Sequence, residues 1–200
     1  MELIFKLRQS IGAPSEPVVG LGDRVQRGEM IAKKPENSLG GNIFSSVNGK
    51  VTEVDGEHIS VEESETDFSK YLPLRGETYK ELLEESGLVG LGGAGFPTYA
   101  KLNVNFEGKG TVLVNAAECE PILSHNIARI EKEPEKLVES LKIVMDMVNA
   151  DRGIIGIKNV HKEAIEDLKR VIDDPRITIH GLQNIYPMGE ERALVRESLG

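Results

Sequence analysis

Apolar strands alternate with amphipathic helices through the second half of the 200-residue sequence. Strands are predicted over 111–115, 153–158 and 176–180, and helices over 134–148 and 162–172. The first two strands are continuously apolar, which is typical of a parallel sheet that is buried on both faces. A strand–helix–strand–helix–strand order implies right-handed crossovers between parallel strands. This half of the chain is therefore expected to form a Rossmann-like parallel sheet with helices, with function at the loops after the carboxyl ends of the strands.

The first 63 residues have a different sequence pattern, with short β-like runs separated by Gly-Asp, Asn-Gly and Asp-Gly turns. This pattern predicts a small all-β barrel or sandwich. Segments 22–31 and 45–51 resemble the two halves of a biotinyl/lipoyl-type barrel-sandwich hybrid. A carrier domain of that kind presents a modifiable lysine at the tip of the hairpin between its halves. Here Lys33 and Lys34 lie beside a predicted strand, so an unmodified structural role is favoured over a swinging arm.

The fold class predicted for the whole chain is thus α/β, with a small N-terminal all-β barrel-sandwich hybrid before the parallel sheet. We expect the hybrid over 1–63, a charged linker over 64–76 and the α/β domain over 77–200. That domain should open with a helix over 77–86, which Gly87 ends.

Charge and cysteine content exclude several classes of function. The 24 Lys and Arg against 33 Asp and Glu give a net charge of −9, which argues against a nucleic-acid partner. With the single cysteine Cys119, these residues alone can form neither a disulfide nor a cysteine-ligated iron–sulfur cluster or zinc site. No signal peptide or membrane-spanning run is recognised. We expect a soluble, cytoplasmic chain that would reach a membrane only through a partner.

The first of three motifs is the glycine-rich segment 90–98, in which Gly90, Gly92 and Gly93 allow close approach of the backbone to a bound group. Successive N–H donors in such a segment can bind an anion. Pro97 is expected to open a short helix, and Lys101, one turn later, could add a positive charge next to a phosphate. A tight structural turn explains the glycines equally well.

The second motif, 115–121, follows the first buried strand, at the edge where open α/β sheets place ligands. If the segment stays extended, Glu118 and Glu120 point the same way, and two neighbouring like charges raise a carboxyl pKa. The alternative is a solvated loop. Metal binding by the two glutamates with His125 is not favoured, because no second histidine is suitably spaced. Cys119 is interpreted as a small packed residue rather than a nucleophile.

The third motif, 186–194, follows the third predicted strand. Gly189, Glu190 and Glu191 lead into a predicted helix that runs to Leu199, where acidic residues complement the positive end of the helix dipole. An ordinary capped helix also accounts for these glutamates.

Together, in this order, the motifs resemble those of the flavoprotein, NADH-oxidising subunit of respiratory complex I. That family reads Gly-Arg-Gly-Gly-Ala-Gly-Phe-Pro-Thr, Asn-Ala-Asp-Glu-Ser-Glu-Pro and Tyr-x-x-Gly-Glu-Glu-x-Ala-Leu at the three motifs. The differences at Leu91, Ala117 and Cys119, with the preceding barrel, point to a more specific likeness. The chain is similar to the C subunit of the Rnf-type ion-translocating ferredoxin:NAD oxidoreductase and to relatives that feed soluble reductases such as proline reductase.

The resemblance implies non-covalent binding of FMN, with NADH as substrate. It implies that the phosphate and ribityl part of FMN is lined by Gly90, Gly92, Gly93 and Lys101. It further implies that the isoalloxazine edge is met by Asn115, Glu118 and Glu120. The nicotinamide side would be closed by Tyr186, Gly189, Glu190 and Glu191. No metal ligand and no residue that performs chemistry of its own are assigned.

The implied function is electron transfer between a nicotinamide nucleotide and iron–sulfur clusters through FMN, with other subunits of an electron transport complex or a soluble reductase as partners. Family members continue beyond the equivalent of residue 200 with a second flavin loop and cysteine-rich cluster motifs, so we expect an N-terminal fragment that is inactive alone. The clusters are expected only in that further part. The alternative is a non-catalytic docking subunit that has lost the flavin. In either case the location would be cytoplasmic, peripheral to a membrane through partners.

Overall fold

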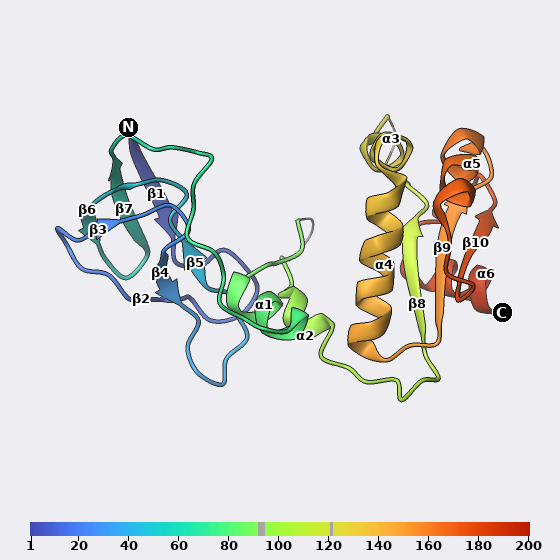
Figure 1. Ribbon diagram of the computed structural model, residues 1–200, viewed down its shortest axis with the longest axis horizontal. Coiled ribbons are helices and arrows are strands. Elements are labelled where there is room, and N and C mark those ends of the chain that lie inside the picture. The colour runs from blue at the N-terminus through green and yellow to red at the C-terminus, as the bar shows by residue number, and fades with distance from the viewer. Residues whose placement is uncertain (92–94, 121) are drawn as a thin grey trace. The chain divides into compact units, whose positions relative to one another are not determined.

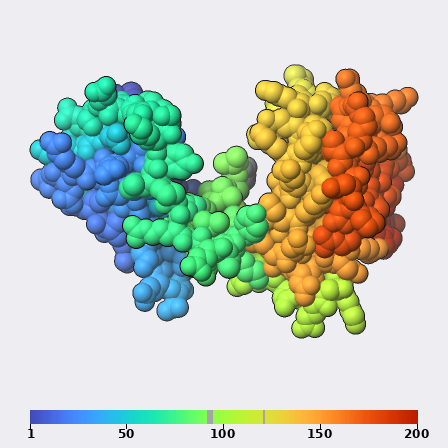
Figure 2. Space-filling model, in the orientation of Figure 1, coloured from blue at the N-terminus to red at the C-terminus, as the bar shows by residue number. Residues whose placement is uncertain are grey.

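A computed structural model of the chain describes residues 1–91, 95–120 and 122–200. The chain divides into two compact units, Met1–Asn103 and Val104–Gly200. Each unit has its own helices and strands (Figure 1) and its own cluster of buried apolar residues, and Figure 2 shows the outer face of both units in the same orientation. Among the described helices, none combines the length and apolarity that crossing a bilayer requires.

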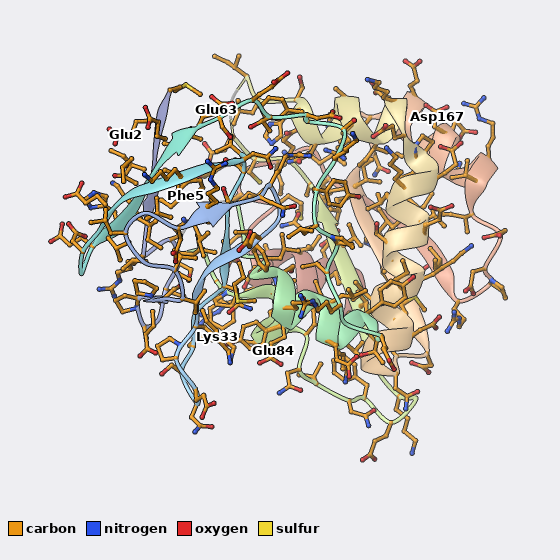
Figure 3. All side chains as sticks on the ribbon, turned by 60° about the vertical axis from the view of Figure 1, so that its left-hand side comes forward. Glu2, Phe5, Lys33, Glu63, Glu84 and Asp167 are labelled. Atoms are coloured by element: carbon orange, nitrogen blue, oxygen red, sulfur yellow. The ribbon has the colours of Figure 1, made fainter. Side chains whose placement is uncertain are left out.

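The first unit is built on two antiparallel sheets. One has the order β1-β7-β6-β3, formed by β1 (Glu2–Lys6), β7 (His58–Glu63), β6 (Gly49–Val54) and β3 (Arg24–Val25). The other has the order β2-β4-β5, formed by β2 (Glu16–Pro17), β4 (Met30–Lys33) and β5 (Ile43–Phe44). In Figure 3, Glu2 and Glu63 mark the neighbouring ends of the paired strands β1 and β7.

One apolar core joins the two sheets. Val51 on β6 and Ile59 and Val61 on β7 are buried in the same cluster as Ile31 and Ala32 on β4. The side chains from β7 come from alternate residues, as expected for two sheets that face each other, whereas β4, whose pairing with β5 is irregular, supplies two adjacent residues. The predicted barrel-sandwich architecture is confirmed.

Segment 64–72, within the expected linker, is hydrogen-bonded to the barrel through Asn48. The backbone N–H of Asn48 donates to Thr66 Oγ1 at 3.0 Å, and its carbonyl accepts the N–H of Ser64 at 2.9 Å. Asn48 Oδ1 accepts the N–H of Arg27 at 2.9 Å, and Nδ2 donates to Glu65 O at 3.3 Å. The Arg27 guanidinium in turn donates to the Phe68 carbonyl at 2.7 Å. One asparagine therefore attaches this segment to two strand ends.

Replacing Asn48 with alanine should lower the free energy of unfolding by about 2 kcal/mol, because a partly buried N–H of Arg27 loses its acceptor. Chemical denaturation should show the loss, and hydrogen exchange should show reduced protection over 64–72. The exposed neighbour Gln26, changed to alanine, is the control and should change stability by less than about 0.5 kcal/mol. Unchanged protection of 64–72 in Asn48→Ala would contradict this account of the attachment.

Two short helices complete the first unit. Helix α1 (Tyr79–Ser86) begins with a capping box, in which Thr78 and Glu81 each accept a backbone N–H from the other. The backbone N–H groups of Thr78 and Glu77, which donate to Glu81 Oε2, hold the pKa of Glu81 below its ordinary value. Gly87 ends α1 with φ +63°, and a Cβ built there would lie 2.2 Å from Asn42 O. Helix α2 (Thr98–Lys101) follows Pro97, as predicted.

The second unit is a three-stranded parallel sheet in the order β10-β9-β8. Its strands are β8 (Thr111–Ala116), β9 (Arg152–Lys158) and β10 (Ile177–Leu182). Its helices are α3 (His125–Lys132), α4 (Pro134–Val148), α5 (Lys162–Val171) and α6 (Glu191–Leu199). The predicted alternation and parallel pairing are confirmed, whereas α3 was not predicted.

Helices cover both faces of this sheet, and two glycines of the central strand β9 mark where they approach. A Cβ at Gly153 would lie 2.7 Å from Met145 Sδ on α4, and one at Gly156 would lie 2.7 Å from Leu194 Cδ1 on α6. Residues three apart on a strand point to opposite faces. Helix α4 therefore lies on one face of the sheet and α6 on the other (Figure 1).

Candidate functional site

The carboxyl end of β8 is joined directly to the loop that precedes α6. Asn115 Nδ2 donates to the carbonyl of Gly189 at 2.8 Å, and its Oδ1 accepts the backbone N–H of Ala117 at 3.1 Å. These contacts bring together the second and third sequence motifs, which are 74 residues apart in the chain. The candidate site of this unit therefore lies at the carboxyl end of the sheet, where open α/β sheets bind ligands.

A second contact between the same motifs involves the only cysteine. Gly189 N–H donates to Cys119 Sγ at 2.7 Å, and the thiol donates to the Ala117 carbonyl at 3.4 Å. A Cβ at Gly189 would lie 2.6 Å from that sulfur, so only glycine fits without a shift. The interpretation of Cys119 as a packed residue agrees with this position.

Glu118 and Glu120 occupy different environments. The Glu118 side chain is only 6% exposed, and its Oε1 accepts the N–H of Asn126 at 3.2 Å at the start of α3. Its Oε2 is buried and has no hydrogen-bond partner among the described residues. Glu120 is exposed. Strand β8 ends at Ala116, so both glutamates lie in the loop that follows it.

Lys158, the last residue of β9, contacts the second motif, and sequence reasoning did not single it out. It is 8% exposed, and its Nζ donates to the carbonyl of Glu118 at 3.0 Å. The sequence did contain one sign of this contact, which is a lysine at the end of a largely apolar predicted strand.

The third motif forms the start of α6. Glu190 Oε2 accepts the N–H of Ala193 at 2.9 Å, so this glutamate caps the helix. Glu191 is exposed in the first turn, and Tyr186 is 79% exposed in the loop before it. The capped-helix interpretation is confirmed for Glu190, while Tyr186 and Glu191 are left accessible to a ligand.

The glycine-rich segment belongs to the first unit. Its ends are paired, because Gly90 N–H donates to the carbonyl of Phe96 and Thr98 N–H donates to that of Leu88, both at 2.9 Å. The Gly90 amide is therefore already used, while Lys101 is exposed at the end of α2. Gly92 and Gly93 lie outside the described residues.

One group of possible metal ligands, Glu53, Asp55 and His58, occurs on the β6–β7 hairpin. Both ring nitrogens of His58 already have carboxylate partners, at 3.3 Å to Glu53 and 3.2 Å to Asp55. Asp55 also accepts the backbone N–H groups of Glu57 and His58, which hold its pKa below the ordinary value. These contacts describe a turn that is closed by hydrogen bonds between side chains and to the backbone.

Residues 83–200 match the family model described as the Nuo51 FMN-binding domain, and residues 1–68 match the RnfC barrel sandwich hybrid domain. The chain belongs to the Nuo51 FMN-binding domain family. Both matches confirm the resemblance drawn from the three motifs and the barrel.

Curated relatives of this Nuo51-family chain are C subunits of Rnf-type complexes. The C subunit of the proton-translocating ferredoxin:NAD(+) oxidoreductase complex of Clostridium ljungdahlii is 31% identical, and the match covers 100% of this chain and 47% of the relative. The C subunit of the Na(+)-translocating complex of Acetobacterium woodii is 30% identical, with 99% and 49% covered. The chain thus spans about half the length of these two relatives.

Among solved structures, an NAD+-reducing [NiFe]-hydrogenase in the H2-reduced state is similar to 55% of this chain and 21% of its own chain, at 27% identity. Its TM-score of 0.47 is too low to support an argument about the fold.

Proposed function

We propose that this chain is the flavin-binding part of an electron-transfer subunit, in which FMN passes electrons between a nicotinamide nucleotide and iron–sulfur clusters. The observation that carries the proposal is the pair of contacts that join Asn115 and Cys119 to Gly189 at the carboxyl end of the sheet. Membership of an FMN-binding domain family supports the same cofactor.

The groups at the end of β8 fit a flavin edge, which carries both carbonyl acceptors and an N–H donor. The side-chain NH₂ group of Asn115 has two hydrogens, and the Gly189 carbonyl accepts one of them. The other hydrogen can be donated to a ligand. The buried Glu118 Oε2 is an acceptor without a donor among the described residues, and Glu120 is an exposed carboxylate. We therefore assign the isoalloxazine edge to Asn115, Glu118 and Glu120.

The other assignments use the two remaining motifs. We assign the nicotinamide side to Tyr186, Gly189, Glu190 and Glu191, with the exposed Tyr186 ring as a stacking surface. Lys101 and the amides of Gly92 and Gly93 would bind the phosphate and ribityl part. The N–H of Gly90 already donates to the Phe96 carbonyl, so Gly90 would instead let the backbone pass close to the ligand because it has no side chain.

FMN, when bound, would accept a hydride and release the two electrons one at a time. The chain supplies binding and orientation. Asn115 and Cys119 fix the Gly189 loop, and Glu190 fixes the start of α6, so the groups on both sides of the site are held before a nucleotide arrives.

We further propose the organisation in which this function operates. The hybrid domain at 1–63 and the connection at 64–76 precede the flavin domain at 77–200. Other subunits of an electron transport complex, or a soluble reductase, would supply the exchange partners, and the protein would be peripheral on the cytoplasmic side of a membrane in the first case. The clusters would lie outside these residues, which contain one cysteine.

The proposal can be tested by titrating the full-length protein with FMN and with riboflavin. Replacing Lys101 with alanine should weaken FMN binding about tenfold, because a phosphate loses a charge-assisted contact. Riboflavin, which has no phosphate, should bind this variant and the wild type equally. The exposed Lys109, changed to alanine, is the matched control and should leave both affinities unchanged.

Failure of the wild-type protein to bind FMN, together with normal assembly with its partner subunits, would contradict the proposal and favour a flavin-free docking subunit. An equal loss of FMN and riboflavin binding in Lys101→Ala would contradict the phosphate role of Lys101.

A further inference from the structure

Lys158 ends the central strand of the sheet in a buried position. It lies two residues beyond Gly156 and so points to the same face, which α6 covers through Leu194. Only 8% of the residue is exposed. Burying an ammonium group is costly unless its hydrogens find partners.

The partner of Lys158 is a backbone oxygen of the neighbouring motif. Its Nζ donates to the carbonyl of Glu118 at 3.0 Å, across 40 residues of sequence. The same Glu118 holds the first turn of α3, because its Oε1 accepts the N–H of Asn126. The lysine therefore fixes a residue that links the segment Asn115–Glu120 to α3.

Packing alone does not account for a lysine at this position. Lys158 forms no ion pair among the described residues, and a methionine would fill a similar volume without the cost of burying a charge. What only the lysine supplies is a charged donor for the Glu118 carbonyl. Gly189 also donates to Cys119 and accepts from Asn115, so the segment Asn115–Glu120 is held at three of its residues.

We propose that Lys158 is a positioning residue, which holds the segment Asn115–Glu120 through the Glu118 carbonyl in the conformation that binds FMN. This inference rests on the proposed function for the identity of the ligand, but not for the effect on the segment itself. Lys158 acts through Glu118 and is not assigned a contact with the flavin.

The test compares wild type, Lys158→Met and Lys162→Met in the full-length protein, where Lys162 is an exposed lysine of α5. Lys158→Met should bind FMN at least tenfold more weakly. In the flavin-free protein, the backbone amides of residues 115–120 and 126 should exchange at least tenfold faster. The thermal midpoint should stay within about 2 °C of wild type or rise, because the methionine carries no burial penalty. Lys162→Met should match wild type in all three measurements.

The outcomes separate this inference from the proposed function. FMN binding and amide exchange in Lys158→Met equal to wild type would overturn the role of Lys158 and leave the flavin proposal standing. A lowered thermal midpoint with normal FMN binding would also overturn it, since it indicates a purely structural residue. If wild type itself binds no FMN, the flavin proposal fails, and the exchange of residues 115–120 alone decides whether Lys158 holds the segment.

Discussion

Replacing Gly87 with alanine is expected to lower the stability of the first unit by about 3 kcal/mol or more, because two separate costs coincide at this position. Gly87 has φ +63°, a conformation that L-residues with a Cβ adopt at a cost. Its Cβ would also lie 2.2 Å from Asn42 O and 2.7 Å from Asn42 N, which are backbone atoms that cannot rotate away. Chemical denaturation measures the loss, and hydrogen exchange over α1 shows whether the helix leaves the barrel.

Substitutions at two other glycines distinguish the cost of the positive φ from the cost of the steric clash. Gly22 has φ +91° with nothing within 4 Å of its Cβ position, so alanine there should cost only about 1 kcal/mol. Gly56 has neither a positive φ nor a close neighbour, and alanine there should change stability by less than about 0.5 kcal/mol. Equal effects at Gly87 and Gly22 would show that the contact with Asn42 contributes nothing.

Replacing Gly189 with alanine in the full-length protein is expected to weaken FMN binding by about 10- to 100-fold, or 1.4 to 2.8 kcal/mol. The new Cβ would lie 2.6 Å from Cys119 Sγ and 3.1 Å from the Ala117 carbonyl, so the loop must move away from the end of β8. That movement would lengthen the bond from Asn115 to the Gly189 carbonyl. Fluorescence titration with FMN measures the effect.

A double variant tests whether the sulfur is the cause. Cys119→Ala removes the Sγ contact and leaves the Cβ of residue 119 at 3.5 Å, an ordinary distance. Gly189→Ala with Cys119→Ala should therefore bind FMN more tightly than Gly189→Ala alone, a non-additive result typical of residues in contact. If Gly189→Ala binds FMN as well as wild type, the contact between the two motifs does not organise a flavin site.

Much of the fold could be predicted because local pattern and tertiary environment agree. Strands β8 and β9 have continuous apolar centres and end close to the predicted positions, and Pro134 marks the start of α4 as expected. Helix α3 was missed for a physical reason. It has two buried apolar residues, Ile127 and Ile130, and a carboxylate from the preceding segment accepts the N–H of Asn126. That stabilisation is tertiary, so eight residues of local sequence do not reveal it.

The meeting of the second and third motifs at one edge of the sheet was predictable, but the individual hydrogen bonds around them were not. Parallel strand ends share one edge, so the meeting of Asn115 with Gly189 follows from topology. Glu118 and Glu120 were expected to point the same way if the segment stayed extended, with a solvated loop as the alternative; the strand ends at Ala116, and Glu118 is nearly buried while Glu120 is exposed. The bond from Lys158 to Glu118 joins a side chain to a backbone oxygen, and no residue pattern encodes such a pair. The phosphate role of Gly92 and Gly93 stays a prediction.

The glycine at position 156 has a mechanical consequence for the third motif. Leu194 occupies the hollow that the missing side chain leaves in the central strand, one turn from Glu190 and Glu191. Helix α6 can therefore neither slide along the sheet nor roll on it without withdrawing Leu194. A larger residue at 156 would raise the whole helix, and the two acidic side chains at its start would be displaced although neither touches the substituted position.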